Sequence, residues 1–339
     1  MRNSTTMASS YPDPMRTPVC DAIGIDYPVF QAGMGMIAQA ELAAAVSEAG
    51  GLGVIGTGLS MRPDELREQI QIVRSTTNKP FGVDILFATV RAKGSSVATY
   101  TDNVQGLIRV TLEERVPVLI SGLGSPKGAV CEAHERGIYV MAVIGAERHA
   151  LKAASDGVDA VIASGRDGGG HVGEVGTAAL VPSVVAAVDV PVIAAGGLAD
   201  GPGLAAALMW GAQGVWLGTR FIATEEAGAH RNYKAKIVDT GSSGTVVTRA
   251  HSGKPCRMIR NAFTDHWAER EAEIQPYPRQ ALEVGNPAST RGRLEGDSEG
   301  GVLPAGQSVG VIRAVEPAGD VVRAIVNQAR AAIATAANL

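Results

Sequence analysis

Residues 139–165 read YVMAVIGAERHALKAASDGVDAVIASG and contain the pattern that decides the fold. A short apolar run rich in β-branched residues (Tyr139–Gly145) is followed by a segment of helical period (Ala146–Gly157) and by a second apolar run (Ala160–Gly165). Continuously apolar strands separated by helices are typical of a parallel sheet that is buried on both faces. This stretch therefore predicts one strand–helix–strand unit of such a sheet.

The same unit recurs between residues 28 and 221. The eight apolar runs are Pro28–Gly33, Gly51–Gly58, Phe81–Ala88, Val116–Gly122, Tyr139–Gly145, Ala160–Gly165, Val190–Gly197 and Gly214–Phe221. The other helical segments include Gln39–Gly50, Pro63–Thr77, Pro126–Gly137 and Asp200–Ala212. Eight such units predict an α/β protein with a closed (β/α)8 barrel, the TIM barrel. The alternative is a doubly wound open sheet, which usually has fewer strands, and no GxGxxG follows the first run.

The segments outside the eight units differ from them in amino-acid composition. Residues 1–18 are polar and lack the apolar core of a secretory signal, so we expect a disordered leader, with Met7 and Met15 as candidate natural starts. Residues 225–310 contain more charge and more turn residues, which predicts a small cap or insertion after strand 8, with a mobile loop near its end. Residues 318–336 form an amphipathic pattern, so the barrel is expected to comprise residues 19–224 and 311–339.

Composition narrows the functional classes. The 339 residues carry a net charge of −4 with both signs interspersed, which gives no field to attract nucleic acid or an anionic membrane. Apolar runs end well before the ~18 residues that a membrane span needs. The three cysteines are far apart and include no CxxC, so we expect reduced thiols, no structural metal site and a cytoplasmic enzyme.

Glycines cluster where the expected strands end. The seventh strand ends in AAGGLADG (194–201) and the eighth passes through LGTRF (217–221). Glycines there let backbone N–H groups approach a phosphate, and the helix after strand seven would add the positive end of its dipole. Together Gly196, Gly197, Gly218 and Thr219 predict the phosphate site that is usual for such barrels.

The loop after the sixth strand gives the sharpest signal. Six glycines fall within Gly165–Gly176, so we expect a flexible loop that lies against a ligand at the barrel mouth. His171 lies in its middle, and an imidazole exchanges protons near neutral pH. We interpret His171 as the catalytic acid or base. The remaining histidines are interpreted as surface or core residues: His134, His149, His230, His251 and His266.

Several of these motifs resemble the nitronate monooxygenase (2-nitropropane dioxygenase) family of flavin enzymes. PVFQAGMG, FGVDILFA, GRDGGGHVG, AAGGLADG, LGTRF, GKPCRMIRNAF and LPAGQSVG are all similar to family motifs. The resemblance implies non-covalent FMN, with His171 as the acid or base beside the flavin. The residues it implies for cofactor binding are Ala32, Gly33, Met34, Asp84, Gly169, Gly170, Gly196, Gly197, Gly218, Thr219 and Gln307.

Two residues depart from the family pattern. Asp84 stands where family members usually have Asn, and an ionised carboxylate can only accept hydrogen bonds. Asp84 therefore either pairs with a cation or a ligand N–H, or does not lie at the flavin. Asp167 replaces the family's Glu, and we interpret it as a loop carboxylate that accepts from backbone N–H groups. The neighbouring Arg166 either pairs with Asp167 or faces solvent, and we favour solvent.

Three functions remain open on the sequence. The first is oxidation of alkyl nitronates with O2 to carbonyl compounds and nitrite, which the resemblance favours. The second is an FMN-dependent NAD(P)H reductase of an enoyl thioester or a quinone, for which a basic patch would serve the dinucleotide: Arg249, Lys254, Arg257 and Arg260. The third is a barrel without redox chemistry, for which Lys127 is the one lysine at the strand ends that suits a Schiff base. The substrate is a small molecule in each case, and the oligomeric state stays open, with a homodimer as one arrangement.

Overall fold

The computed structural model describes residues 13–87, 89–91 and 98–338, and its centre is an eight-stranded parallel sheet. The strands follow the order β1-β11-β10-β8-β7-β6-β3-β2, and a parallel bridge between Phe30 and Leu52 joins the two edges into a barrel. Their bounds are β1 (Val29–Gln31), β2 (Gly53–Gly56), β3 (Phe81–Leu86), β6 (Val118–Leu123), β7 (Tyr139–Ile144), β8 (Ala160–Ser164), β10 (Val192–Ala195) and β11 (Val215–Leu217). The predicted TIM barrel is confirmed, and each expected run overlaps one strand.

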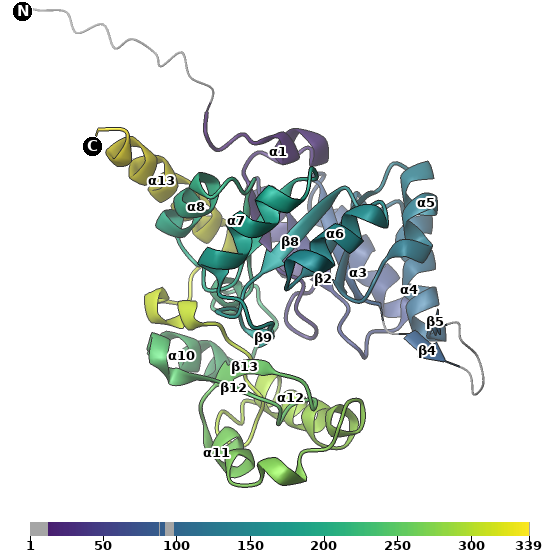
Figure 1. Cartoon of the computed structure of the whole chain (residues 1–339), viewed down its shortest axis with the longest axis vertical. Helices are drawn as coiled ribbons and strands as arrows, with labels where there is room; N and C mark the ends of the chain where they lie inside the picture. Colours follow the sequence, from purple (N-terminus) through teal and green to yellow (C-terminus); the bar gives the residue numbers. More distant parts are fainter. Residues whose placement is uncertain (1–12, 88, 92–97, 339) are drawn as a thin grey trace, which may run out of the picture.

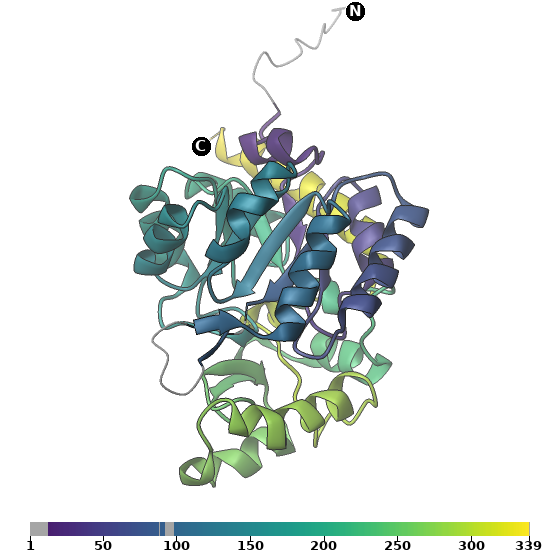
Figure 2. The same ribbon diagram turned by 90° about the vertical axis from the view of Figure 1, so that its right-hand side faces the viewer.

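Helices surround the barrel (Figure 1 and Figure 2). They are α2 (Ala40–Glu48), α3 (Pro63–Thr76), α4 (Asp102–Glu113), α5 (Lys127–Glu135), α6 (Glu147–Ser155), α7 (Thr177–Ala187), α8 (Gly201–Met209) and α13 (Ala318–Ala336). The eighth run was expected to stay extended to Phe221, but the strand ends at Leu217 and Thr219–Ile222 forms the short helix α9. A hairpin of β4 (Thr89–Arg91) and β5 (Ala98–Tyr100) follows β3. No helix in the described ranges is long and apolar enough to cross a bilayer.

Two apolar layers hold the barrel together. One lies between the strands and the helices, and the other fills the barrel interior with side chains such as Phe30, Ile120 and Trp216. Helix α1 (Pro18–Ile23) packs into the second layer and lies at the end of the barrel opposite the cap (Figure 1). Met15 is fully buried in the first layer, so residues 13–18 are folded, contrary to the expected leader. Residues 1–12 lie outside the described residues.

The segment of residues 225–310, which was expected to be the cap, contributes elements that lie at the carboxyl ends of the strands (Figure 1). Its elements are α10 (Arg231–Asp239), η1 (Ser242–Gly244), β12 (Thr245–Thr248), β13 (Cys256–Ile259), α11 (Ala262–Ala268), η2 (Glu271–Glu273), η3 (Ala281–Gly285) and α12 (Asn286–Arg293), followed by η4 (Gln307–Val311). Strand β13 pairs with β12 and with β9 (Gly170–His171), which lies in the sixth barrel loop. The loop expected to be flexible is thus held in a three-stranded sheet, because the cap supplies backbone partners that are remote in sequence.

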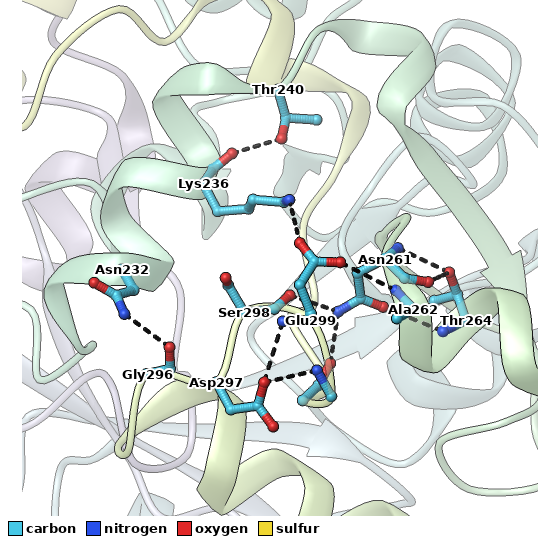
Figure 3. Close-up of polar contacts among 12 residues, drawn as sticks. Asn232, Lys236, Thr240, Asn261, Ala262, Thr264, Gly296, Asp297, Ser298 and Glu299 are labelled. Atoms are coloured by element: carbon cyan, nitrogen blue, oxygen red, sulfur yellow. Dashed lines mark hydrogen bonds and ion pairs between the residues drawn. The ribbon is translucent and has the colours of Figure 1, made fainter.

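The end of the cap was expected to be a mobile loop, but residues 296–301 are fastened by polar contacts (Figure 3). Glu299 forms an ion pair with Lys236 of α10 at 2.7 Å. The Asn261 side chain at the start of α11 donates to the carbonyl oxygens of Ser298 and Gly301 at 2.9 and 2.8 Å. Asp297 accepts from the N–H of Gly300 at 2.7 Å. These contacts join α10, α11 and the segment after α12, so the polar composition reflects capping rather than mobility.

Candidate active site

A cavity of about 300 Å³ lies at the carboxyl ends of the barrel strands, beneath the cap. It brings together eleven of the twelve site residues predicted from the sequence: Ala32, Gly33, Met34, Asp84, Gly169, Gly170, His171, Gly196, Gly197, Gly218 and Thr219. The exception is Gln307, whose side chain is exposed and does not line the cavity. The next residue, Ser308, lines it instead. The 3-10 turn of η4 points the side chains of Gln307 and Ser308 in different directions, and a sequence motif does not reveal these directions.

Asp84 lies at the floor of this cavity, inside the barrel. A Cβ built on Gly33 would lie 2.3 Å from the Cβ of Asp84, and one built on Gly122 would lie 2.4 Å from Asp84 Oδ1. Asp84 is 7% exposed, and its Oδ1 has no hydrogen-bond partner in the described part of the chain. Burial raises the pKa of this carboxyl well above its usual value, and the N–H of Gly122 offsets the shift only in part. Of the two alternatives from the sequence, Asp84 is at the cavity, and no cation contributes to its pKa.

The expected phosphate-binding glycines line one side of the cavity. Gly196 and Gly197 have φ of 101° and 71°, a conformation that strains any other residue. The N–H groups at the start of α8 already have partners, because Gln328 accepts from Gly201 and Asp200 accepts from Gly203; the expected contribution of the helix dipole stays a prediction.

Helix α9 begins at the cavity instead of α8. Thr219 is its first residue, and Thr219 and the preceding Gly218 both line the cavity. The Thr219 hydroxyl accepts from the N–H of Gly306 at 2.9 Å. This bond attaches the segment after the cap to the barrel beside the expected phosphate site.

His171 reaches the cavity from β9. Its Nε2 lies 2.7 Å from Ser252 Oγ of the cap, and the residue lines the cavity. Enclosure by protein, followed by the positive charges of Lys254 and Arg293, lowers the pKa of His171 to about 4. The imidazole is therefore neutral at pH 7 and available as a base.

The rest of the sixth loop is braced by contacts of its own. As expected, the Asp167 carboxylate accepts from a backbone N–H, that of Thr177, at 2.8 Å. The neighbouring Arg166 reaches back to the carbonyl oxygen of Gly173 at 3.5 Å and is half-buried, so it does not simply face solvent.

The cap contributes residues that sequence reasoning missed. His251, interpreted as a surface or core residue, lines the cavity with its ring centroid 5.6 Å from that of His171. Its Nε2 lies 3.3 Å from Ser289 Oγ, and burial lowers the pKa of His251 to about 3. Arg293 lines the same cavity from the end of α12. A signal existed for His251, since it precedes the quoted motif GKPCRMIRNAF by two residues; none marked Arg293.

Unpartnered polar atoms concentrate at this cavity. In the described ranges, four buried side-chain atoms have no hydrogen-bond partner: Asp84 Oδ1, Arg220 Nε, His251 Nδ1 and Arg293 Nε. Three of the four belong to cavity-lining residues. Such atoms are rare in folded proteins because each costs about 1–3 kcal/mol. Their concentration indicates that a bound polar molecule, with both donors and acceptors, completes the site.

A second, larger cavity of about 780 Å³ adjoins the first. Both are lined by Gly122, Leu123, Val143, Ser164, His171 and Lys254. Its wall is mainly apolar, and its charged residues are Arg148, Lys152, Lys254, Asp156 and Glu174. Of the four members of the expected basic patch, only Lys254 lines either cavity. Arg257 is buried and binds the carbonyl oxygen of Arg166 and Thr245 Oγ1 instead.

Comparison with known proteins gives consistent matches. Residues 16–328 match the family described as Nitronate monooxygenase. A relative from Mycobacterium tuberculosis, "(3aS,4S,5R,7aS)-5-hydroxy-7a-methyl-1-oxo-octahydro-1H-indene-4-carboxyl-CoA dehydrogenase", is 42% identical over 74% of this chain and 68% of its own length. A "Probable nitronate monooxygenase" from Staphylococcus saprophyticus is 34% identical over 78% of this chain and 84% of its own. The solved structure of FabK from Thermotoga maritima superposes with a TM-score of 0.87 at 40% identity and covers 95% of this chain and 99% of that one.

Proposed function

The chain belongs to the nitronate monooxygenase family of oxidoreductases, and from that premise we propose that it is an FMN-dependent oxidoreductase of acyl thioesters. Such a substrate has a small reacting end and a long arm, as in a coenzyme A ester. The supporting observation is the 780 Å³ cavity, which opens from the 300 Å³ cavity at His171 and Lys254. A small nitronate leaves this larger space unused. Nitronate oxidation, which the sequence favours, therefore becomes the second candidate.

The residues present fit FMN. The glycines at the ends of β10 and β11 allow close approach of backbone to a phosphate, and a Cβ on Gly170 would meet nothing within 4 Å, so the cavity is open there. Asp84 Oδ1 and Arg293 Nε have no partner among the described residues. The first suits a polar edge of a ligand and the second suits a negative charge or an acceptor on it. When bound, FMN supplies the redox chemistry that amino-acid side chains lack.

The side chains of this chain would position the substrate and move its proton. Since His171 Nε2 faces Ser252, Nδ1 is the ring nitrogen left for a substrate, and a neutral imidazole there accepts a proton from the carbon next to a thioester carbonyl. Arg293 and Lys254 place positive charge near the same point, which stabilises the resulting oxyanion. The arm of the thioester would lie along the larger cavity, past Arg148.

The second candidate is supported by one specific feature. The 300 Å³ cavity contains two cationic side chains, Arg293 and Lys254, and no ion pair joins either one to a carboxylate within the described residues. A compact anion such as an alkyl nitronate fits that charge. With a thioester, the same cations meet a negative charge only in the transition state. The two candidate substrates should therefore differ in ground-state affinity, with the nitronate bound more tightly.

The test is anaerobic reduction of the bound flavin, followed in the visible spectrum. The protein is mixed separately with a saturated acyl-CoA, with an alkyl nitronate, and with NADH or NADPH in the presence and absence of an enoyl-CoA. We expect the flavin spectrum to change with the acyl-CoA or with the reduced nicotinamide cofactor. Change with nitronate alone would establish the second candidate, and a colourless protein that binds no FMN would remove both.

Arg148→Ala tests the arm specifically. It should raise KM about fivefold for the CoA thioester, which is worth about 1 kcal/mol at an exposed site, and leave a short-arm thioester unaffected. Arg323→Ala, on α13 and outside both cavities, is the matched control.

A further inference from the structure

Asp84 combines features that an ionised carboxylate does not tolerate. It projects from the end of β3 into the barrel interior, where β2 and β6 pair with its strand at Gly56 and Ile120. The Gly33 and Gly122 backbones flank its carboxyl group. No donor contacts Oδ1 in the described ranges, yet the side chain lines the cofactor cavity. A buried carboxylate that has only the Gly122 N–H as a partner still costs several kcal/mol, so such a group keeps its proton.

The charges around Asp84 do not change this conclusion. The elements packed against it are β2, β6 and residues 32–34, and none of them carries an ionisable side chain. The titratable groups that share its cavity come from the cap and the sixth loop: His171, Tyr233, His251, Lys254, Cys256, Tyr277 and Arg293. None of these contributes to the upward shift in the pKa of Asp84, which burial causes.

We propose that Asp84 is a neutral carboxylic acid in the native protein and that it both donates a hydrogen bond to, and accepts one from, a polar edge of the bound flavin. A protonated carboxyl has one O–H donor and a carbonyl acceptor, which is the pattern of an asparagine side chain. The departure from the family's Asn thus changes the atoms but keeps the hydrogen-bonding pattern. This inference rests on the proposed binding of FMN in this cavity.

The carboxyl differs from an amide in that it ionises. As the pH rises through the pKa of Asp84, the acid loses its donor hydrogen and places a negative charge against the ligand. FMN affinity should therefore fall with rising pH in the wild type and stay constant in Asp84→Asn. Asp84→Leu, similar in size but without polar atoms, should bind FMN about tenfold to a hundredfold more weakly at pH 7, since it leaves the flavin edge unpaired.

Two measurements test this. The first is the infrared difference spectrum of wild type minus Asp84→Asn at pH 7, with and without FMN. It should contain the C=O band of a protonated acid, shifted in ²H2O, and carboxylate bands alone would overturn the proposal. The second is the FMN Kd at pH 7 by flavin fluorescence. Asp84→Asn should stay within about threefold of wild type, and equal binding by Asp84→Leu would overturn the proposal.

The two proposals fail separately. If the wild type binds no FMN, the proposed function fails, while the infrared spectrum of the apoprotein still decides whether Asp84 is protonated. If FMN binds tightly but the carboxylate bands appear, the assignment of Asp84 alone is wrong. Thermal unfolding of each variant shows that the comparison is between folded proteins.

Discussion

Gly33→Ala should damage the cavity floor through a single clash. The new Cβ would lie 2.3 Å from the Cβ of Asp84, and Cβ atoms do not approach within 3.0 Å in real structures. Rotation of the Asp84 side chain does not relieve this contact, because the clashing atom is the Cβ, which the backbone of β3 holds in place. Overpacking of this kind costs about 1–3 kcal/mol. At about 2 °C per kcal/mol for a chain of this size, Tm should fall by about 2–6 °C.

A double-mutant cycle isolates that clash. Because the closest contact is to the Cβ of Asp84, Asp84→Gly should relieve it and Asp84→Ala should not. Gly33→Ala and Asp84→Gly should therefore show a favourable coupling of about 1–3 kcal/mol in the free energy of unfolding, measured with urea. Gly218→Ala is the matched control, since its Cβ would meet Ala32 and Met34 at an ordinary 3.6 Å. Additive effects of Gly33→Ala and Asp84→Gly would refute this geometry.

Other predictions concern the histidines, Asp84 and the cap. His171→Ala should keep FMN bound and lower turnover at least about a hundredfold; near-normal turnover with the true substrate would contradict the role of His171 as base. In the folded protein the pKa values of His171 and His251 are lowered to about 4 and about 3, so below about pH 6.5 the unfolded chain binds more protons than the folded one. Tm should therefore fall as the pH drops from 6.5 toward 4, and it should fall less in His251→Gln. The pKa of Asp84 is shifted in the opposite direction, upward, so Asp84→Asn should increasingly stabilise the apoprotein relative to wild type as the pH rises above about 4. A difference in Tm between variant and wild type that does not change with pH would count against a neutral acid. Glu299→Gln should lower stability by at most about 1 kcal/mol, because the carboxylate paired with Lys236 is 58% exposed; a larger loss in urea unfolding would show that the cap depends on this ion pair.

The fold was readable because its signal is local. Apolar runs such as the one at residues 160–163 are buried on both faces, so the sequence shows strands without knowledge of their partners. Helix α13 has the bounds that its amphipathic pattern predicts, Ala318–Ala336. The glycines at strand ends were also identifiable, because backbone conformation and close approach are requirements on single positions.

The sequence by itself thus determined the barrel, the end of it at which the cavity lies and most of the residues that line this cavity. Only the tertiary structure placed His251 and Arg293 beside His171, because the cap folds back over the mouth through contacts between residues far apart in the chain. It also showed that Ser308 lines the cavity and Gln307 does not, which depends on the direction of one turn. The protonation of Asp84 was undecidable from sequence for the same reason: it depends on burial and on the absence of a cation among the described neighbours, and both are properties of the packed structure.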